Sequence, residues 1–264
     1  MRRTFVYSDE LKEDFGETVK RHAPLPDNYD YSEGGLPFRM LSSFLYRFVA
    51  RPLAWCYVKI KFSHRFVNKS VLKGLKSGYI IYSNHVTLLG DALIPNLLSA
   101  RKRNYILTGR DASSLTRILP IMKCVGNIPL GETPAQQVKM VRAVKRTLEH
   151  GDSVTVYPEA HVWPYYTGIR PFSEKSLYYS VITGCPAIAV TTCFQKRRFF
   201  KTPRIVSYID GPFYPEEGKS KRENAEYLRS KVFHAMEMRA SEYSTYSYHN
   251  YVKAEEPSLE EQGS

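Results

Sequence analysis

Cysteine is scarce in this sequence. The chain has four cysteines among 264 residues, and no two of them form a C-x-x-C pair. The start of the chain, Met1-Arg2-Arg3, opens onto charged residues rather than the apolar core of a secretory signal. We therefore predict reduced, mostly buried thiols, no signal peptide and a cytosolic setting.

Signatures of several common protein classes are also missing. The sequence contains no G-x-S-x-G motif, no glycine-rich phosphate loop, no zinc-finger spacing, no basic region that runs into heptads, and no internal repeat. These absences argue against a serine hydrolase and a nucleotide-binding enzyme. They also predict that nucleic acid is not a partner.

Positive charge and aromatic residues are abundant instead. The formal net charge is +12, and there are 20 tyrosines and 13 phenylalanines. Such charge predicts an anionic partner, either an anionic membrane surface or a phosphorylated or acidic substrate. Many tyrosines suit a half-wet surface such as a membrane boundary. The alternative is that the charge only keeps the protein soluble.

Short β-favouring runs alternate with helical patterns through most of the chain. This alternation predicts one large α/β domain with a mostly parallel mixed sheet that is flanked by helices. The expected strands are 79–82, 104–108, 126–130, 153–157, 186–194 and 204–209, and the expected helices are 88–100, 113–122, 133–151, 173–184 and 220–242.

The two ends of the chain differ from this pattern. Residues 8–22 carry mixed charges after a capping serine and predict a short exposed helix. Proline and glycine residues mark a linker up to residue 37. We therefore divide the chain into an extension and linker (1–37), a main domain (38–245) and a loose tail (246–264).

Residues 38–62 are strongly apolar and aromatic, but basic residues recur through them and Pro52 interrupts them. Crossing a bilayer takes about 20 mostly apolar residues, and the central Arg47 and Arg51 make this run fail that requirement. We predict a broken helix pair that lies in the membrane interface. The alternative is a helix that packs on the core of the protein itself.

A possible catalytic pair follows the strand at 79–82. His85 comes in the turn after this strand, and Asp91 lies in the next apolar run. Ligands of open α/β sheets bind beyond the carboxyl ends of the strands. An aspartate near a histidine can hold the imidazole in one tautomer and stabilise its protonated form. The pair is therefore a candidate general-base dyad.

A second strand ends in the same way. Glu159 follows the strand at 153–157, and Arg170 comes eleven residues later. If the two strands are parallel, these groups and His85 share one edge of the sheet. A base, a carboxylate and a guanidinium at one edge suit a substrate that carries a hydroxyl and a phosphate. Capping or surface roles are the alternatives.

Four separated blocks resemble the glycerolipid acyltransferases, of which the lysophosphatidic acid acyltransferases are the best-known members. The resemblance covers roughly residues 38–215, in the family's order. The blocks are Asn84-His85 with Asp91, Gly126-Asn-Ile-Pro-Leu130, Tyr157-Pro158-Glu159, and Pro186-Ala-Ile-Ala-Val190.

The resemblance implies the transfer of an acyl group from acyl-CoA or acyl carrier protein to the free hydroxyl of a lysophospholipid. The expected acceptor is 1-acylglycerol 3-phosphate, which gives phosphatidic acid. His85 would take the proton of the attacking hydroxyl and Asp91 would orient it. Glu159, with Asn84 and Thr87 beside the histidine, would bind substrate. No metal, cofactor or acyl-enzyme is implied. The expected location is the cytoplasmic face of the cell membrane, seated there by residues 38–62.

The sequence departs from the family pattern at three places. Five residues separate His85 from Asp91 where the family has four, and one added helical residue would turn the carboxylate by about 100°. A bulge or loop at Gly90 could absorb this residue, since glycine accepts unusual dihedral angles. Gly131-Glu132 replaces a phosphate-binding basic residue, and Ala160-His161-Val162 replaces Gly-Thr-Arg. We expect Arg170 to supply the missing cation.

Two other functions remain as alternatives. The first is a metal-dependent hydrolase that uses His85, Asp91, Glu159 and His161, because such side chains can bind zinc. The second is an inactive relative that retains only the basic face and the membrane-seating segment. Restoration of activity by zinc after chelation would identify the first, and vesicle binding without acyl transfer would identify the second.

Overall fold

The computed structural model describes residues 2–16, 24–32, 34–109 and 119–254. Its main sheet has seven strands in the order β2-β8-β7-β3-β6-β4-β5. Neighbouring strands run parallel except β7 and β8, so the predicted mostly parallel mixed sheet is confirmed. The strands are β2 (Arg65–Val67), β3 (Tyr79–Ser83), β4 (Asn104–Thr108), β5 (Asn127–Pro129), β6 (Ser153–Val156), β7 (Ala187–Gln195) and β8 (Arg204–Phe213).

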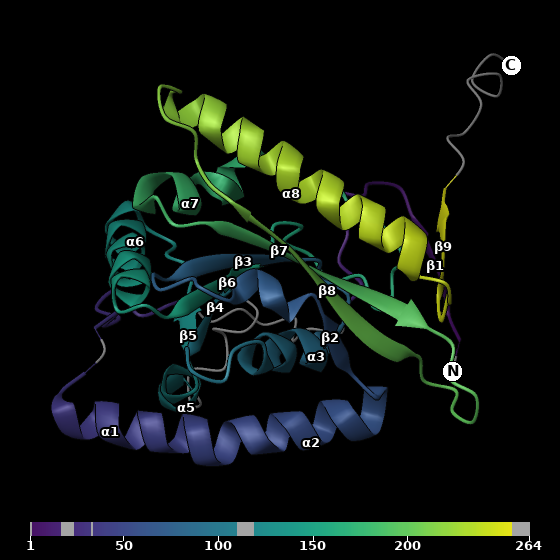
Figure 1. Cartoon of the computed structure of the whole chain (residues 1–264), viewed down its shortest axis with the longest axis horizontal. Helices are drawn as coiled ribbons and strands as arrows, with labels where there is room; N and C mark the ends of the chain where they lie inside the picture. Colours follow the sequence, from purple (N-terminus) through teal and green to yellow (C-terminus); the bar gives the residue numbers. More distant parts are fainter. Residues whose placement is uncertain (1, 17–23, 33, 110–118, 255–264) are drawn as a thin grey trace, which may run out of the picture.

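Helices cover both faces of this sheet (Figure 1). Helices α7 and α8 lie above the sheet in the view of Figure 1, and α1, α2, α3 and α5 lie below it. Helix α6 lies at the left and packs into the same core cluster as α8. The helices are α1 (Leu36–Phe44), α2 (Arg51–Phe62), α3 (Leu88–Leu93), α5 (Leu119–Cys124), α6 (Pro134–Glu149), α7 (Tyr178–Thr183) and α8 (Lys221–Tyr243). Short 3₁₀ segments extend α3 (Ile94–Leu97) and precede α7 (Glu174–Leu177).

Strand β3 lies at the centre of the sheet, between β6 and β7, and all its residues are buried. Successive side chains point to opposite faces of a strand. Ile80 and Tyr82 accordingly pack with α6 and α8 on one face, whereas Tyr79 and Ile81 join the core on the other. A strand that is buried on both faces has a continuous run of apolar residues in the sequence, so β3 could be predicted from the sequence.

The segment 36–62 is one helix, and the predicted break at Pro52 is wrong (Figure 1). A π-helical stretch, η1 (Leu45–Ala50), joins α1 to α2 with helical backbone angles throughout. Proline lacks an N–H group and its ring crowds the carbonyl four residues earlier. The wider π turn that precedes Pro52 accommodates both effects, so the helix continues.

The chain ends also differ from expectation. Residues 8–16 form turns and not the expected helix, and the rest of the expected helix, 17–22, lies outside the described residues. Strand β1 (Thr4–Tyr7) pairs in parallel with β9 (Asn250–Lys253), so the expectation of a loose tail is wrong for β9. Such a pairing joins the two ends of the chain, and no local pattern in the sequence signals it.

Two local expectations were incomplete. Asp210-Gly211-Pro212, expected as a turn, lies within β8, beside an irregularity of the β7–β8 ladder between Ala187 and Ala189. Proline cannot donate to a ladder and is tolerated at such irregular positions. The part of the expected helix 113–122 that precedes residue 119 lies outside the described residues.

In the described part of the chain, no helix is long and apolar enough to cross a membrane.

His64 at the end of α2 provides a test of the packing beneath the sheet. Its ring is 3% exposed, and Nε2 lies 3.1 Å from Ser207 Oγ. Burial, with the charges of Lys59 and Lys69, lowers the pKa of His64 from 6.5 to about 4. Between these values the unfolded chain binds a proton that the folded chain does not, so stability falls as the pH falls.

We expect His64 to account for a loss of about 3 kcal/mol of unfolding free energy between pH 7 and pH 4, at 1.36 kcal/mol per pKa unit. The variant His64→Gln should lose that much less over the same range. Urea unfolding of both proteins at a series of pH values measures the difference. Parallel curves for the two proteins would contradict the lowered pKa.

Candidate active site

The end of β3 is held firmly to β7. Ser83 Oγ donates a 2.7 Å hydrogen bond to the Val190 carbonyl. The side-chain amide of Asn84 donates to the Thr192 carbonyl and accepts from the Thr192 N–H. Asn84 is 1% exposed and acts here like one more residue of the ladder. Its position favours fixing the next residue, His85, over contacting a substrate.

His85 and Asp91 meet across the turn that follows. His85 Nδ1 lies 2.7 Å from Asp91 Oδ2. Thr87 holds the same carboxylate, because its N–H donates to Oδ2 at 2.9 Å and its hydroxyl to Oδ1 at 2.6 Å. Thr87 is 4% exposed, so its role here is to orient Asp91. The sequence-predicted pair is therefore brought together, and the buried Thr87, expected as a substrate-binding residue, is engaged with Asp91.

The longer spacing between the two residues does not separate them. Helix α3 begins only at Leu88, and Thr87 is its N-cap with extended backbone angles. The added residue therefore lies in extended chain and adds no rotation to the helix. The expected bulge at Gly90 is wrong, since Gly90 is an ordinary residue of α3. Glycine is required there for another reason, because a Cβ atom would lie 2.3 Å from Thr87 Oγ1.

Tyr157 is a part of the site that the sequence reasoning missed. Its ring stacks on the imidazole of His85 with centroids 4.5 Å apart, and its hydroxyl donates to the Asp91 carbonyl at 2.6 Å. Burial, with the negative charge of Asp91, raises the pKa of Tyr157 well above 10. The hydroxyl therefore stays protonated as a donor. Its position directly before Pro158-Glu159 was the available signal.

Glu159 and Arg170 lie beneath His85. Glu159 accepts the His85 backbone N–H at 3.1 Å and the Arg170 backbone N–H at 3.0 Å. The Arg170 guanidinium lies 3.3 Å from the Glu159 carboxylate, and both side chains are almost fully buried. Burial raises the pKa of Glu159, and the charge of Arg170 opposes this shift. Their direct effect is to position the backbone of His85.

The expectation that Arg170 binds the acceptor phosphate is not supported by this placement. Arg170 is 1% exposed, and its guanidinium also donates to the carbonyls of Glu10 and His161. A guanidinium that is paired with a carboxylate and buried from solvent is not accessible to a substrate phosphate. The same burial, at 4% exposure, argues against direct substrate contact by Glu159.

The two ends of the chain support this buried pair. Trp163 donates its backbone N–H to the His85 carbonyl at 3.1 Å, and its ring stacks on Tyr251 of β9. The indole N–H donates to the carbonyl of Glu13. The β1–β9 ribbon therefore lies behind the segment that carries His85. The sequence predicted neither the ribbon nor this contact.

His85 is the accessible member of the site. Its side chain is 20% exposed, against 4% for Asp91. With Asp91 accepting from Nδ1, a neutral imidazole presents Nε2 as a proton acceptor. Among the residues that the structure describes, none forms a hydrogen bond with Nε2. The arrangement can therefore take a proton from a hydroxyl group that is brought to this edge of the sheet.

The four residues of the metal-hydrolase alternative do not converge. Glu159 is engaged by Arg170, and His161 Nδ1 lies 3.4 Å from Asp14 instead. Across the described ranges, no three His, Cys, Asp or Glu side chains are arranged to hold a metal ion. The geometry thus offers this alternative no ligand set.

Comparisons with known proteins support the fold. No protein-family profile and no curated protein matches the chain. Among solved structures, the chain is similar to the crystal structure of the 1-acyl-sn-glycerophosphate (LPA) acyltransferase PlsC from Thermotoga maritima, with a TM-score of 0.54 and coverage of 78% of this chain and 81% of that chain. At 16% identity, the likeness establishes a shared fold. The fold expected from the sequence resemblance is confirmed.

Proposed function

We propose that this chain is an O-acyltransferase with His85 as its general base. His85 Nε2 takes the proton of an acceptor hydroxyl while the hydroxyl oxygen forms a bond to the carbonyl carbon of an acyl thioester. The C–S bond then breaks, and the imidazolium returns the proton to the leaving thiolate. Asp91 holds the imidazole in the required tautomer and stabilises its charged form.

One observation carries this proposal. The imidazole of His85 is fixed on its Nδ1 side by the 2.7 Å contact with Asp91, and the side chain remains 20% exposed directly after the carboxyl end of the central strand β3. Thr87, Tyr157 and Glu159 all act on this pair through direct hydrogen bonds. Such preorganisation of a single base favours proton transfer over a purely structural role.

We propose a lysophospholipid as the acceptor, most directly 1-acylglycerol 3-phosphate, and acyl-CoA or acyl carrier protein as the donor. The T. maritima structure with the same fold is described as an LPA acyltransferase. The net charge of +12 suits an acceptor and a donor that carry phosphate groups, as well as an anionic membrane. The four cysteines are free thiols, which suits the cytoplasmic face of the cell membrane.

Transfer of a labelled acyl group by the purified protein tests the reaction. Acyl-CoA and acyl carrier protein are each offered with a panel of lysophospholipids of different headgroups, and the products are separated and counted. We expect phosphatidic acid from 1-acylglycerol 3-phosphate. Vesicle binding with no product from any pair would instead identify an inactive membrane-surface protein.

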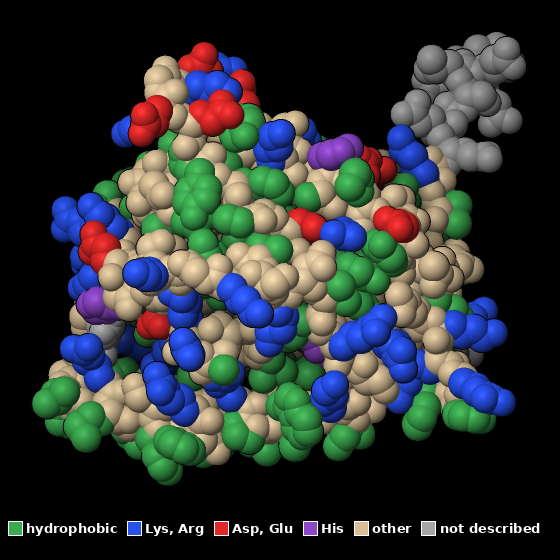
Figure 2. Space-filling view, viewed as in Figure 1, with side chains coloured by type: hydrophobic (Ala, Val, Ile, Leu, Met, Phe, Trp, Pro, Cys, Tyr) green, Lys and Arg blue, Asp and Glu red, His purple; other side chains and the backbone are tan. Residues whose placement is uncertain are grey.

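The exposed surface of the helix formed by α1, η1 and α2 supports binding of this helix at the membrane interface. Its inner side packs on the core through Ala54, Val58 and Phe62. Its outer side forms an apolar row beneath a band of basic side chains (Figure 2). In interfacial helices, an apolar face enters the lipid while Lys and Arg side chains lie at the level of the headgroups. The exposed apolar side chains are Leu36, Met40, Leu41, Phe44, Phe48, Val49, Leu53, Trp55 and Ile60.

Replacing Leu53 by serine should weaken binding to anionic vesicles. Leu53 is 65% exposed, and burying a leucine side chain in an apolar phase contributes about 1.5–3 kcal/mol. We expect a roughly tenfold weaker partition, since each 1.4 kcal/mol is about a factor of ten. Met238→Ser on α8 is the matched control, because Met238 is 52% exposed on the other side of the sheet. Equal binding of both variants in vesicle sedimentation would contradict membrane binding through the α1–η1–α2 helix.

A further inference from the structure

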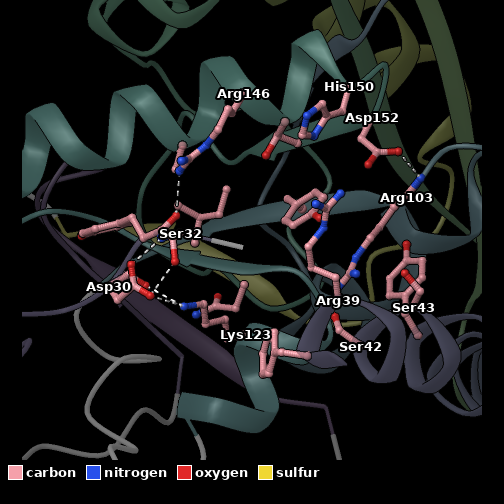
Figure 3. Close-up of a pocket in the computed structure, with 18 of the residues that line it drawn as sticks. Asp30, Ser32, Arg39, Ser42, Ser43, Arg103, Lys123, Arg146, His150 and Asp152 are labelled. Carbon is pink, nitrogen blue, oxygen red and sulfur yellow. Dashed lines mark hydrogen bonds and ion pairs between the residues drawn. The ribbon is translucent and has the colours of Figure 1, made fainter. Parts of the chain in front are cut away.

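A cavity of about 230 Å³ lies at the opposite edge of the sheet from His85. Its walls come from α1 and η1, from α5 and α6, from the beginning of β4, and from β5. Figure 3 shows Arg146 of α6 and Arg39 of α1 pointing into the space between these elements. A pocket for a drug-sized ligand has about 300–1,000 Å³, so this one suits a smaller group.

This cavity is separate from the proposed active site. Asp152 lines it and directly precedes β6, whose Ser153 pairs with Tyr79 at the beginning of β3. His85 follows the far end of β3. Because a strand rises about 3.3 Å per residue, roughly 20 Å separate the two sites along the sheet.

The charge of the cavity is strongly positive. Five cationic side chains and two carboxylates line it, which leaves a formal charge of +3 with His150 neutral. The cations come from four separate parts of the fold, so the cluster is assembled by tertiary structure. They are Arg39, Arg47, Arg103, Lys123 and Arg146.

Some buried donors without a partner belong to residues that line the cavity. Seven buried side-chain polar atoms in the described residues have no hydrogen-bond partner, and three of them belong to residues that line this cavity. They are Tyr31 Oη, Asn127 Nδ2 and Arg103 Nε. The pKa of Tyr31 is raised to about 12, mainly by burial, so its hydroxyl keeps its proton. All three groups can donate hydrogen bonds, and an unpaired buried donor calls for an acceptor.

The wall formed by residues 29–32 is held by the same cations. Lys123 Nζ donates to the Asp30 carbonyl at 2.8 Å, and Arg146 donates to the Tyr31 carbonyl at 3.1 Å. Lys123 Nζ uses a second donor on the Asp30 carboxylate at 3.4 Å, whereas Arg146 uses one of its five N–H donors on Tyr31. The remaining donors are positioned by the bonds already made.

We propose that this cavity binds a phosphate group, and that an anionic phospholipid headgroup presents it at the membrane surface. Phosphate oxygens are strong acceptors, and arginine binds them through paired hydrogen bonds. Figure 2 shows a hollow rimmed by basic side chains just above the apolar row of the α1–η1–α2 helix. A lipid headgroup would therefore reach the cavity from the surface on which this helix lies. A soluble phosphate compound has the same chemistry, and the test separates the two sources.

The test compares two variants of α6 in the full-length protein. Arg146→Gln removes a cation from the cavity, and Arg142→Gln removes the same charge from the same helix outside the lining residues. Glycerol 3-phosphate is titrated in one arm by calorimetry. Sedimentation with phosphatidylcholine vesicles, with and without phosphatidic acid, is the other arm. We expect Arg146→Gln to weaken binding about tenfold, the loss typical of one charge-assisted hydrogen bond, and Arg142→Gln to leave it unchanged.

Each outcome decides the proposal. If Arg146→Gln weakens binding to phosphatidic acid vesicles and Arg142→Gln does not, the lipid headgroup is supported. If Arg146→Gln weakens the binding of glycerol 3-phosphate but not of the vesicles, the site binds a soluble phosphate compound instead of a lipid. Identical behaviour of the two variants in both arms, or no binding by the wild type, overturns the site. Arg47→Gln on the opposite wall replaces Arg146→Gln if that variant does not fold. His85→Ala should bind like the wild type, so failure of the proposed activity would be distinguishable.

Discussion

Replacing His85 by alanine is expected to lower the rate of acyl transfer by about 10³-fold, within the range that a positioned general base contributes. Nε2 is the atom that would receive the proton of the attacking hydroxyl, and alanine offers no acceptor in its place. Stability should change little, because His85 is partly exposed and the bonds to Glu159 and Trp163 are made by its backbone. Labelled acyl transfer at saturating donor and acceptor measures the effect.

His161 provides the matched control for this variant. It follows the same strand end as Glu159, but its ring faces Asp14 and not the proposed substrate edge. His161→Ala should therefore keep the activity of the wild type, and both variants should bind vesicles equally. A His85→Ala protein that retains most of the wild-type rate would remove the general-base mechanism and leave the acyltransferase fold without its proposed base.

Replacing Asp91 by asparagine should lower kcat by about 10²–10⁴-fold with little change in KM. The asparagine oxygen, in the place of Oδ1, can still accept the hydrogen bond of the Thr87 hydroxyl, whereas the Thr87 N–H loses the acceptor that Oδ2 provided. Its NH₂ group then faces His85 and donates to Nδ1, which places the imidazole proton on Nε2. A protonated Nε2 cannot accept the proton of the hydroxyl, so the imidazole is present but in the wrong tautomer.

A structural role for Asp91 predicts a different result. In that case Asp91→Asn would lower the unfolding temperature, and activity measured well below that temperature would persist. Nitrogen NMR of His85 in both proteins reports the tautomer directly, and we expect the proton to move from Nδ1 to Nε2. Thr87→Val is the graded comparison, because it removes one of the bonds to the Asp91 carboxylate and leaves the charge in place. Its loss of activity should be the smaller one.

Much of the fold was predictable because its elements carry their own local signals. Helix α6 begins at Thr133, which forms a capping box with Gln136, and Pro134 occupies the first helical turn. Helix α8 begins with the same kind of box between Ser220 and Glu223. Strand β3 is a continuous apolar run because both its faces are buried. Patterns of this kind depend only on neighbours in the chain.

The errors arose where distant segments meet. The β1–β9 pair joins residues that are separated by almost the whole chain, and its aromatic side chains pack on Trp163. The helix through Pro52 is a local exception, because its continuity depends on a neighbouring π turn that propensity does not predict. Arg170 was expected at the substrate because a guanidinium suits a phosphate. Its burial against Glu159 became visible only in three dimensions.

The sequence by itself determined the order of six strands of the main sheet and of most helices, and the identity of His85 and Asp91 as a candidate pair, because periodicity and motif spacing are local properties. Only the tertiary structure decided that the pair closes at 2.7 Å, that Glu159 and Arg170 support it from beneath, and that a basic cavity forms at the far edge. Contact distance, burial and charge density depend on segments that the fold brings together. Spacing along the chain does not contain this information.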